Sequence, residues 1–129
     1  MKREIYGKLA EDGFHGEDGK TYPISANYVS KSRLLIGDGL KMMFDDRGIV
    51  FKQVELVPRR TAYACVRTSE NSGDMYAAVE SGEVYMIPRA SASFFRLRNG
   101  DEIMVIIPLS KEDSGGMCAL DGVIKNTPR

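Results

Sequence analysis

Short runs of residues that alternate between apolar and polar side chains, each closed by glycine, aspartate or proline, dominate the chain. Alternation with a period of two is typical of β-strands that bury one face, and glycine and aspartate supply the turns between them. The pattern predicts strands over residues 3–10, 20–24, 39–44, 49–56, 62–68, 76–79, 84–87, 102–108 and 117–124. Short helices are expected over residues 26–32, with Ser25 as N-cap, and over residues 90–95. Residues 11–19 and 109–116 are expected to be loops.

The chain contains two copies of one pattern. Residues 19–44 align with residues 82–107 without a gap, and most differences keep the character of the position. The identical pairs are Gly19/Gly82, Tyr22/Tyr85, Ile24/Ile87, Ser30/Ser93, Arg33/Arg96, Leu34/Leu97, Gly37/Gly100 and Asp38/Asp101. Two copies without a third favour one closed pseudo-symmetric domain over an open solenoid.

The repeat predicts a mainly β fold, a single pseudo-twofold β-barrel formed by two ββαββ-type repeats with one short helix each. Repeat one is expected over about residues 3–56 and repeat two over about residues 62–124. Residues 57–61 then form a link that is too short for a flexible tether between domains. We therefore expect residues 1–129 to form a single domain, which is long enough for a hydrophobic core.

In each copy the helix is followed by a leucine, a short turn and a Gly-Asp pair that opens a strand, Gly37-Asp38 and Gly100-Asp101. This arrangement resembles the GD box of cradle-loop β-barrels, a group that includes the double-psi barrels. The resemblance implies that the glycine permits a tight approach and that the aspartate bonds the backbone of a neighbouring segment. Residues 22–32, 51–53 and 100–101 are also similar to a family of small uncharacterised bacterial proteins from reduced-genome lineages, some of which carry ribosomal-protein labels.

Composition and charge restrict the class of protein. Apolar residues make up 43% of the chain and charged residues 28%, as expected of a soluble globular protein. The 18 basic residues are balanced by 18 acidic ones, which argues against strong nonspecific binding to nucleic acid. No long apolar run and no apolar signal segment occur, so we expect a cytoplasmic protein without a membrane partner. Cys65 and Cys118 are expected to be buried free thiols.

No catalytic constellation is evident, and an enzyme is the less favoured interpretation. His15 is the only histidine, so neither a Ser-His-Asp nor a Cys-His arrangement can be assembled. Asp113-Ser114-Gly115 is the triplet that aspartic proteases use, but it lies in a hydrophilic loop and the first copy has no counterpart. No His/Cys/Asp cluster indicates a metal site. We therefore expect no catalytic residue, no metal and no cofactor.

Basic residues around the two expected helices form the candidate binding site. Because pseudo-symmetry relates Arg33 to Arg96, their side chains are candidates for one face that contacts phosphate groups. Exposed aromatic residues such as Tyr28 or Phe94 could stack on bases beside them. The sequence therefore favours a nonenzymatic module that binds RNA or a ribonucleoprotein assembly. The candidate nucleic-acid-binding residues are Lys31, Arg33, Arg59, Arg60, Arg89, Arg96 and Arg98.

Other interpretations stay open at this point. The basic residues could be scattered solvated charges, or Arg33 and Arg96 could bond the Gly-Asp carboxylate of their own copy. The chain could instead be a protein-interaction or self-assembly module that forms a homo-oligomer through exposed apolar residues on an edge strand or the helices. A third possibility is a small enzyme with a cleft between the repeats, which would need a reactive group that the spacing does not reveal.

Overall fold

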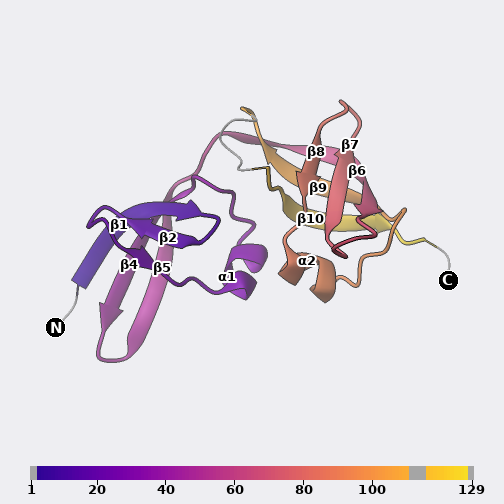
Figure 1. Cartoon of the computed structure of the whole chain (residues 1–129). Coiled ribbons are helices and arrows are strands. Elements are labelled where there is room, and N and C mark those ends of the chain that lie inside the picture. The colour runs from indigo at the N-terminus through magenta and orange to yellow at the C-terminus, as the bar shows by residue number, and fades with distance from the viewer. Residues whose placement is uncertain (1–2, 111–115, 128–129) are drawn as a thin grey trace.

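The computed structural model describes residues 3–110 and 116–127 and is mainly β (Figure 1). The expected loop over residues 109–116 lies partly outside the described residues, and the triplet Asp113-Ser114-Gly115 lies entirely outside them. In chain order the elements of the first half are β1 (Arg3–Ala10), β2 (Gly13–Gly16), β3 (Thr21–Tyr22), α1 (Ala26–Lys31), β4 (Gly39–Asp45) and β5 (Gly48–Glu55). Those of the second half are β6 (Arg59–Thr68), β7 (Met75–Val79), β8 (Val84–Met86), α2 (Arg89–Phe94), β9 (Glu102–Pro108) and β10 (Ala119–Lys125).

Each half of the chain forms its own five-stranded antiparallel sheet, and the two sheets have the same topology. The strand order is β3-β2-β1-β4-β5 in repeat one and β8-β7-β6-β9-β10 in repeat two. In both repeats the first three strands form a meander, and the helix then leads to a hairpin whose first strand pairs with the first strand of the repeat. The mainly β class, the two repeats and one short helix in each are therefore confirmed.

The structure differs from the expectation in two respects. Strand β2 lies within the segment expected to be a loop, because Gly13–Gly16 pairs with both β1 and β3. Its only large apolar side chain, Phe14, is fully buried. In addition, no ladder joins a strand of repeat one to a strand of repeat two among the described residues, so the pairing does not show one barrel shared by both copies.

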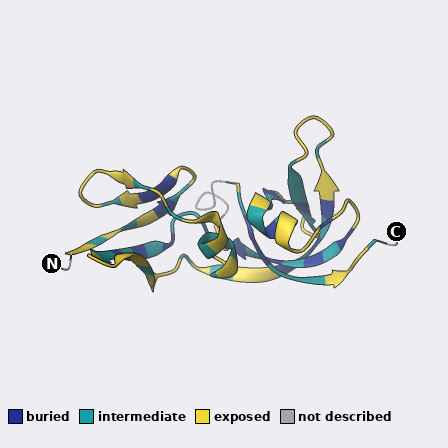
Figure 2. Cartoon of the chain, turned by 90° about the horizontal axis from the view of Figure 1, so that it is seen from below, coloured by how far each residue is buried: buried dark blue, intermediate teal, exposed yellow. Residues whose placement is uncertain are grey.

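Two hydrophobic clusters follow this division (Figure 2). The cluster of repeat two is large and aliphatic, and Ala64, Val66, Ile103 and Val105 at its centre have no exposed surface. The cluster of repeat one has fewer fully buried residues and contains more aromatic rings. Burying these faces stabilises each sheet by roughly 25 cal/mol for every Å² of apolar surface removed from water.

The repeats differ in how the third strand meets the fifth. In repeat two the Met86 N–H donates to the Gly116 carbonyl at 2.7 Å, and the Cys118 N–H donates to the Met86 carbonyl at 3.0 Å, which forms a parallel bridge. The position equivalent to Met86 in repeat one is Pro23, which has no N–H to donate. There the Tyr28 hydroxyl donates to the Phe51 carbonyl at 3.2 Å instead. Repeat one therefore leaves the outer edge of β5 without a strand partner.

The two helices lie side by side between the sheets (Figure 1) and join the repeats. Ser30 of α1 and Ser91 of α2 are hydrogen bonded through their hydroxyl groups. Ser25 caps α1 as expected, since its hydroxyl accepts from the Tyr28 N–H at 3.3 Å. Arg33 and Arg96 follow their helices in the left-handed conformation, with φ of 53° and 52°, where glycine is the usual residue.

The Gly-Asp pairs connect backbone segments in the same way in both repeats. The buried Asp38 carboxylate accepts from the N–H groups of Leu35 and Val57, at 2.7 and 2.9 Å. The buried Asp101 carboxylate accepts from Arg98 and Thr127, at 2.7 and 2.6 Å. Both aspartates thus make the backbone bonds that the GD-box resemblance implied. Membership of the cradle-loop group stays a prediction.

Candidate nucleic-acid interface

Most of the basic residues singled out from the sequence have acidic partners. Four of the seven form ion pairs, and these neutralise much of the charge that could attract phosphate groups. The pairs are Arg33–Asp121 at 3.4 Å, Arg60–Glu83 at 3.5 Å, Arg89–Asp74 at 2.7 Å and Arg59–Asp38. The structure therefore does not bring all seven together as free cations on one face.

Arg59 has a clear structural role. Its guanidinium donates to the Val57 carbonyl at 3.0 Å and to the Arg33 carbonyl at 3.3 Å, and it pairs with the Asp38 carboxylate. It therefore ties the end of α1, the Gly-Asp pair and the link between the repeats together. Arg59, rather than Arg33, bonds the carboxylate of repeat one. Arg33 instead reaches Asp121 in repeat two, so it joins the two repeats.

Lys31, Arg96 and Arg98 are exposed and form no ion pair with a described residue. Lys31 is in the last turn of α1, whereas Arg96 and Arg98 directly follow α2. The end of α2 is thus the part of the candidate site where two cations remain available to a ligand.

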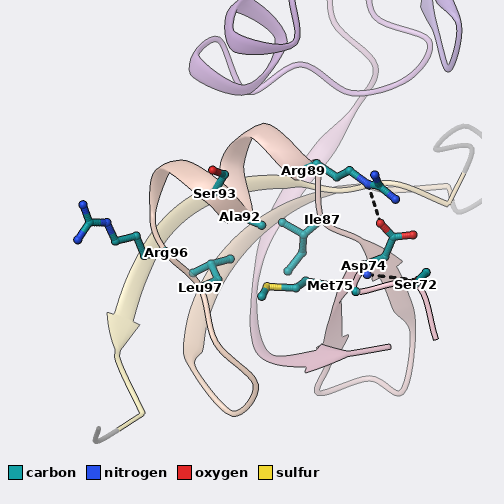
Figure 3. A pocket seen from close by; sticks show the side chains of 10 residues that line it. Ser72, Asp74, Met75, Ile87, Arg89, Ala92, Ser93, Arg96 and Leu97 are labelled. Carbon is teal, nitrogen blue, oxygen red and sulfur yellow. Dashed lines mark hydrogen bonds and ion pairs between the residues drawn. The ribbon is translucent and has the colours of Figure 1, made fainter. Parts of the chain in front are cut away.

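A pocket lies between α2 and the loop that precedes β7 (Figure 3). It has a volume of about 380 Å³, with Met75, Ile87 and Leu97 among its apolar lining residues. The ion pair between Arg89 and Asp74 stands at one side (Figure 3), and it lowers the pKa of Asp74 below its ordinary value. Arg96 lines the other side and extends outward from the turn after α2 (Figure 3).

A second, smaller hollow adjoins this pocket through Arg96. It has a volume of about 190 Å³ and is lined by Phe95, Arg96, Arg98, Asn126 and Thr127. The neighbouring Phe94 is 79% exposed, and its ring meets the Phe95 ring edge to face at a centroid distance of 5.0 Å. Phe95 is itself 40% exposed, so the two rings form a small contiguous apolar patch on the surface.

We call the two hollows, together with the exposed Phe94 ring that contacts Phe95, the α2 surface. Its members are Ser72, Gly73, Asp74, Met75, Ile87, Arg89, Ala92, Ser93, Phe94, Phe95, Arg96, Leu97, Arg98, Asn126 and Thr127.

Repeat one provides an internal control for the aromatic pair. The residues equivalent to Phe94 and Phe95 are Lys31 and Ser32, and α1 ends in the same geometry as α2 with those polar side chains. In both repeats the N–H of the third residue after the helix donates to a carbonyl of the helix, at 3.1 Å for Leu34 and 2.9 Å for Leu97. The fold therefore does not require phenylalanine at positions 94 and 95. The mismatch between the aligned copies was the sequence signal that could have identified Phe95.

The cleft between the repeats is the place where an enzymatic site would be sought. It has a volume of about 430 Å³ and is mostly apolar, with Glu11, Asp12, Arg89 and Cys118 among its lining residues. Burial raises the pKa of the Cys118 thiol to about 12, which removes it as a nucleophile at neutral pH. His15 lies on the surface, and its Nε2 is hydrogen bonded to the Asp12 carboxylate at 2.6 Å. No group of acidic, histidine or cysteine side chains within the described residues could hold a metal ion.

Comparison with protein-family models, with curated proteins and with solved structures finds no match. In the part of the chain that the structure describes, no helix is long and apolar enough to cross a membrane. The functional argument therefore depends on the chemistry of the site.

Proposed function

We propose that this chain is a nonenzymatic module that binds single-stranded RNA on the α2 surface. The observation that carries the proposal is Phe94, a phenylalanine that is exposed without a structural need. Its ring contacts Phe95, which shares a hollow with Arg96 and Arg98, two cations that form no ion pair with a described residue. An exposed ring and a guanidinium are the two groups that single-stranded nucleic acids require, since bases stack on the first and phosphates pair with the second.

The expected strength of binding follows from these few groups. Stacking of one base on an aromatic ring is worth about 1–3 kcal/mol, so Phe94 contributes a substantial part of a modest affinity. Arg96 and Arg98 supply two phosphate contacts, and each adds about 0.7 to the slope of log K against log salt for a single strand. The balanced net charge gives little long-range attraction, so the binding should depend on this local surface.

Single strands are favoured over duplexes because a stacked base has no free face. An exposed side chain such as Phe94 can only stack on a base that is splayed out of a helix. The shape of the α2 surface supports the same choice, since it is a pair of shallow hollows next to a ring.

Fluorescence anisotropy with a short labelled single-stranded RNA tests the proposal at several salt concentrations. Phe94→Ala should weaken binding by roughly 5- to 100-fold without lowering stability, because the ring is exposed. Arg96→Ala combined with Arg98→Ala should weaken binding and reduce the salt slope by about 1.4. Arg47→Ala is the matched control, since it removes an exposed cation in the turn between β4 and β5.

Several results would contradict the proposal. An affinity that is the same at low and high salt would show that Arg96 and Arg98 do not contact phosphate groups. An equal loss for Arg47→Ala and Arg96→Ala would show that only overall charge matters. If the folded protein bound no RNA, its ligand would have to belong to another chemical class.

A further inference from the structure

Strand β5 is an exposed hydrophobic edge. It is the last strand of its sheet and pairs only with β4, in the hairpin that extends away from repeat two at the lower left of Figure 1. Seven of its eight residues are exposed, and only Phe51 is partly buried. Ile49, Val50 and Val54 have exposed fractions of 55%, 56% and 55%. An unpaired strand with apolar side chains on both faces is a template for another strand.

The equivalent strand of repeat two does not offer such an edge. Just before β10 the backbone is bridged to Met86 of β8, and Ala119 and Leu120 of β10 are buried. The difference arises from Pro23, since it cannot make the bond that Met86 makes. The bridge therefore covers the start of this edge in repeat two, whereas repeat one has no such bridge among the described residues.

We infer that a second copy of this chain pairs with β5 along this edge, antiparallel and about a twofold axis. A twofold axis perpendicular to the joined sheets keeps the inner faces of both copies on one side. Inward-facing residues of one copy must then lie opposite inward-facing residues of the other copy. Because side chains alternate between faces, the allowed registers differ from one another by two residues. One such register places Phe51 opposite Phe51 of the second copy.

The positions of charged residues favour this register over the two registers that are shifted by two residues. It places Arg47, the turn residue directly before β5, next to Glu55 of the second copy at both ends of the paired segment, and Val50 opposite Lys52. Neither Arg47 nor Glu55 forms an ion pair with a described residue of its own chain. A shift of two residues in one direction brings Lys52 opposite Lys52, which is unfavourable between directly opposed strands. The shift in the other direction would place Glu55 beyond the start of β5 of the second copy, without an opposing strand residue, because the chain turns at residues 46–47.

The Tyr28 hydroxyl leaves room for this pairing. It occupies one acceptor site of the Phe51 carbonyl, at 3.2 Å, and a carbonyl oxygen has two such sites. Pairing would also cover the aliphatic side chains of Ile49 and Val50. An edge-to-edge contact of one short strand buries little surface, so the dimer is expected to be weak and to depend on concentration.

Sedimentation velocity on the full chain, from low-micromolar to near-millimolar concentration, tests this inference. The wild-type protein should pass from monomer to dimer. Val50→Lys should weaken the dimer at least tenfold, because a lysine on an edge opposes pairing. Ile124→Lys is the matched control, since Ile124 is equally exposed, at 53%, on β10. Its dimer should be unchanged.

Charge reversal tests the register itself. Arg47→Glu and Glu55→Arg should each weaken the dimer, since each places like charges opposite one another. The double variant should restore it. A protein that stays monomeric at all concentrations overturns the inference, and so does a dimer that survives both Val50→Lys and the single charge reversals. RNA binding is measured separately on the Val50→Lys monomer, and its retention or loss reports only on the α2 surface.

Discussion

The substitution Asp38→Asn keeps the shape of a fully buried side chain and removes its charge. In the native protein the carboxylate accepts hydrogen bonds from two backbone N–H groups, those of Leu35 and Val57, and from the guanidinium of Arg59. An amide offers one acceptor oxygen and one donor nitrogen. At least one of the three donors therefore loses its acceptor, and Arg59 loses its counter-charge.

The size of the effect follows from these contacts. A buried N–H without an acceptor costs about 1–3 kcal/mol, and removing one partner of a buried ion pair costs about 3–5 kcal/mol. The side chain of Arg59 is 19% exposed, which places the loss at the lower end. We expect Asp38→Asn to lower the free energy of unfolding by about 3 kcal/mol and Tm by roughly 10 °C. Asp101 has two backbone donors and no ion pair with a described residue, so Asp101→Asn should cost about 2 kcal/mol.

Urea denaturation followed by far-UV circular dichroism measures both losses, provided that the slope m is unchanged. Asp45→Asn is the control, because Asp45 is exposed at the end of β4 and the amide oxygen of asparagine can still accept from the Arg47 N–H, so stability should change by less than about 0.5 kcal/mol. A loss for Asp38→Asn no larger than for the control would refute the assignment of the carboxylate as the link between the two backbone segments. Equal losses of unfolding free energy for Asp38→Asn and Asp101→Asn would show that the ion pair between Arg59 and Asp38 does not stabilise the protein.

Three further predictions concern stability and reactivity. Gly7→Ala should lower the free energy of unfolding by at least about 2 kcal/mol in urea denaturation, because an added Cβ would lie 2.1 Å from the His15 carbonyl oxygen. At mildly alkaline pH a thiol reagent should modify Cys65 and spare Cys118, because burial raises the pKa of the Cys118 thiol to about 12. Rapid reaction of both thiols without denaturant would contradict this prediction. Burial raises the pKa of Asp101, but its hydrogen bonds outweigh that effect, and the net pKa lies below the ordinary 3.8. Its stabilisation is therefore present above that value and lost as the pH falls through the folded pKa, so Asp101→Asn should flatten the acid side of the stability profile.

The internal repeat made most of the fold predictable. Strands such as Arg3–Ala10 and Glu102–Pro108 were predicted with their observed bounds, because alternation marks a strand that buries one face. Strand β2 was missed because it has one large apolar residue, Phe14, and begins and ends with glycine. It is a strand because β1 and β3 pair with it on both sides, which is a tertiary contact and not a local preference.

The candidate site was only partly predictable. Arg96, Arg98 and Phe94 could be proposed from their position after a short helix, and they lie together on the α2 surface. The sequence could not reveal that Arg59 bonds the buried Asp38. Nor could it reveal that Arg33 crosses to the other repeat. Such pairings depend on where the backbone brings residues 21 or 88 positions apart.

The sequence by itself determined most of the strands, the duplication and the two Gly-Asp pairs, because these are set by side-chain periodicity and by the conformations that glycine and aspartate favour. Only the tertiary structure decided that each copy keeps its own sheet, which charges are neutralised, and which edge stays open. Those outcomes depend on hydrogen bonds between distant backbone segments. A single residue such as Pro23 can remove one of these bonds without altering the local pattern.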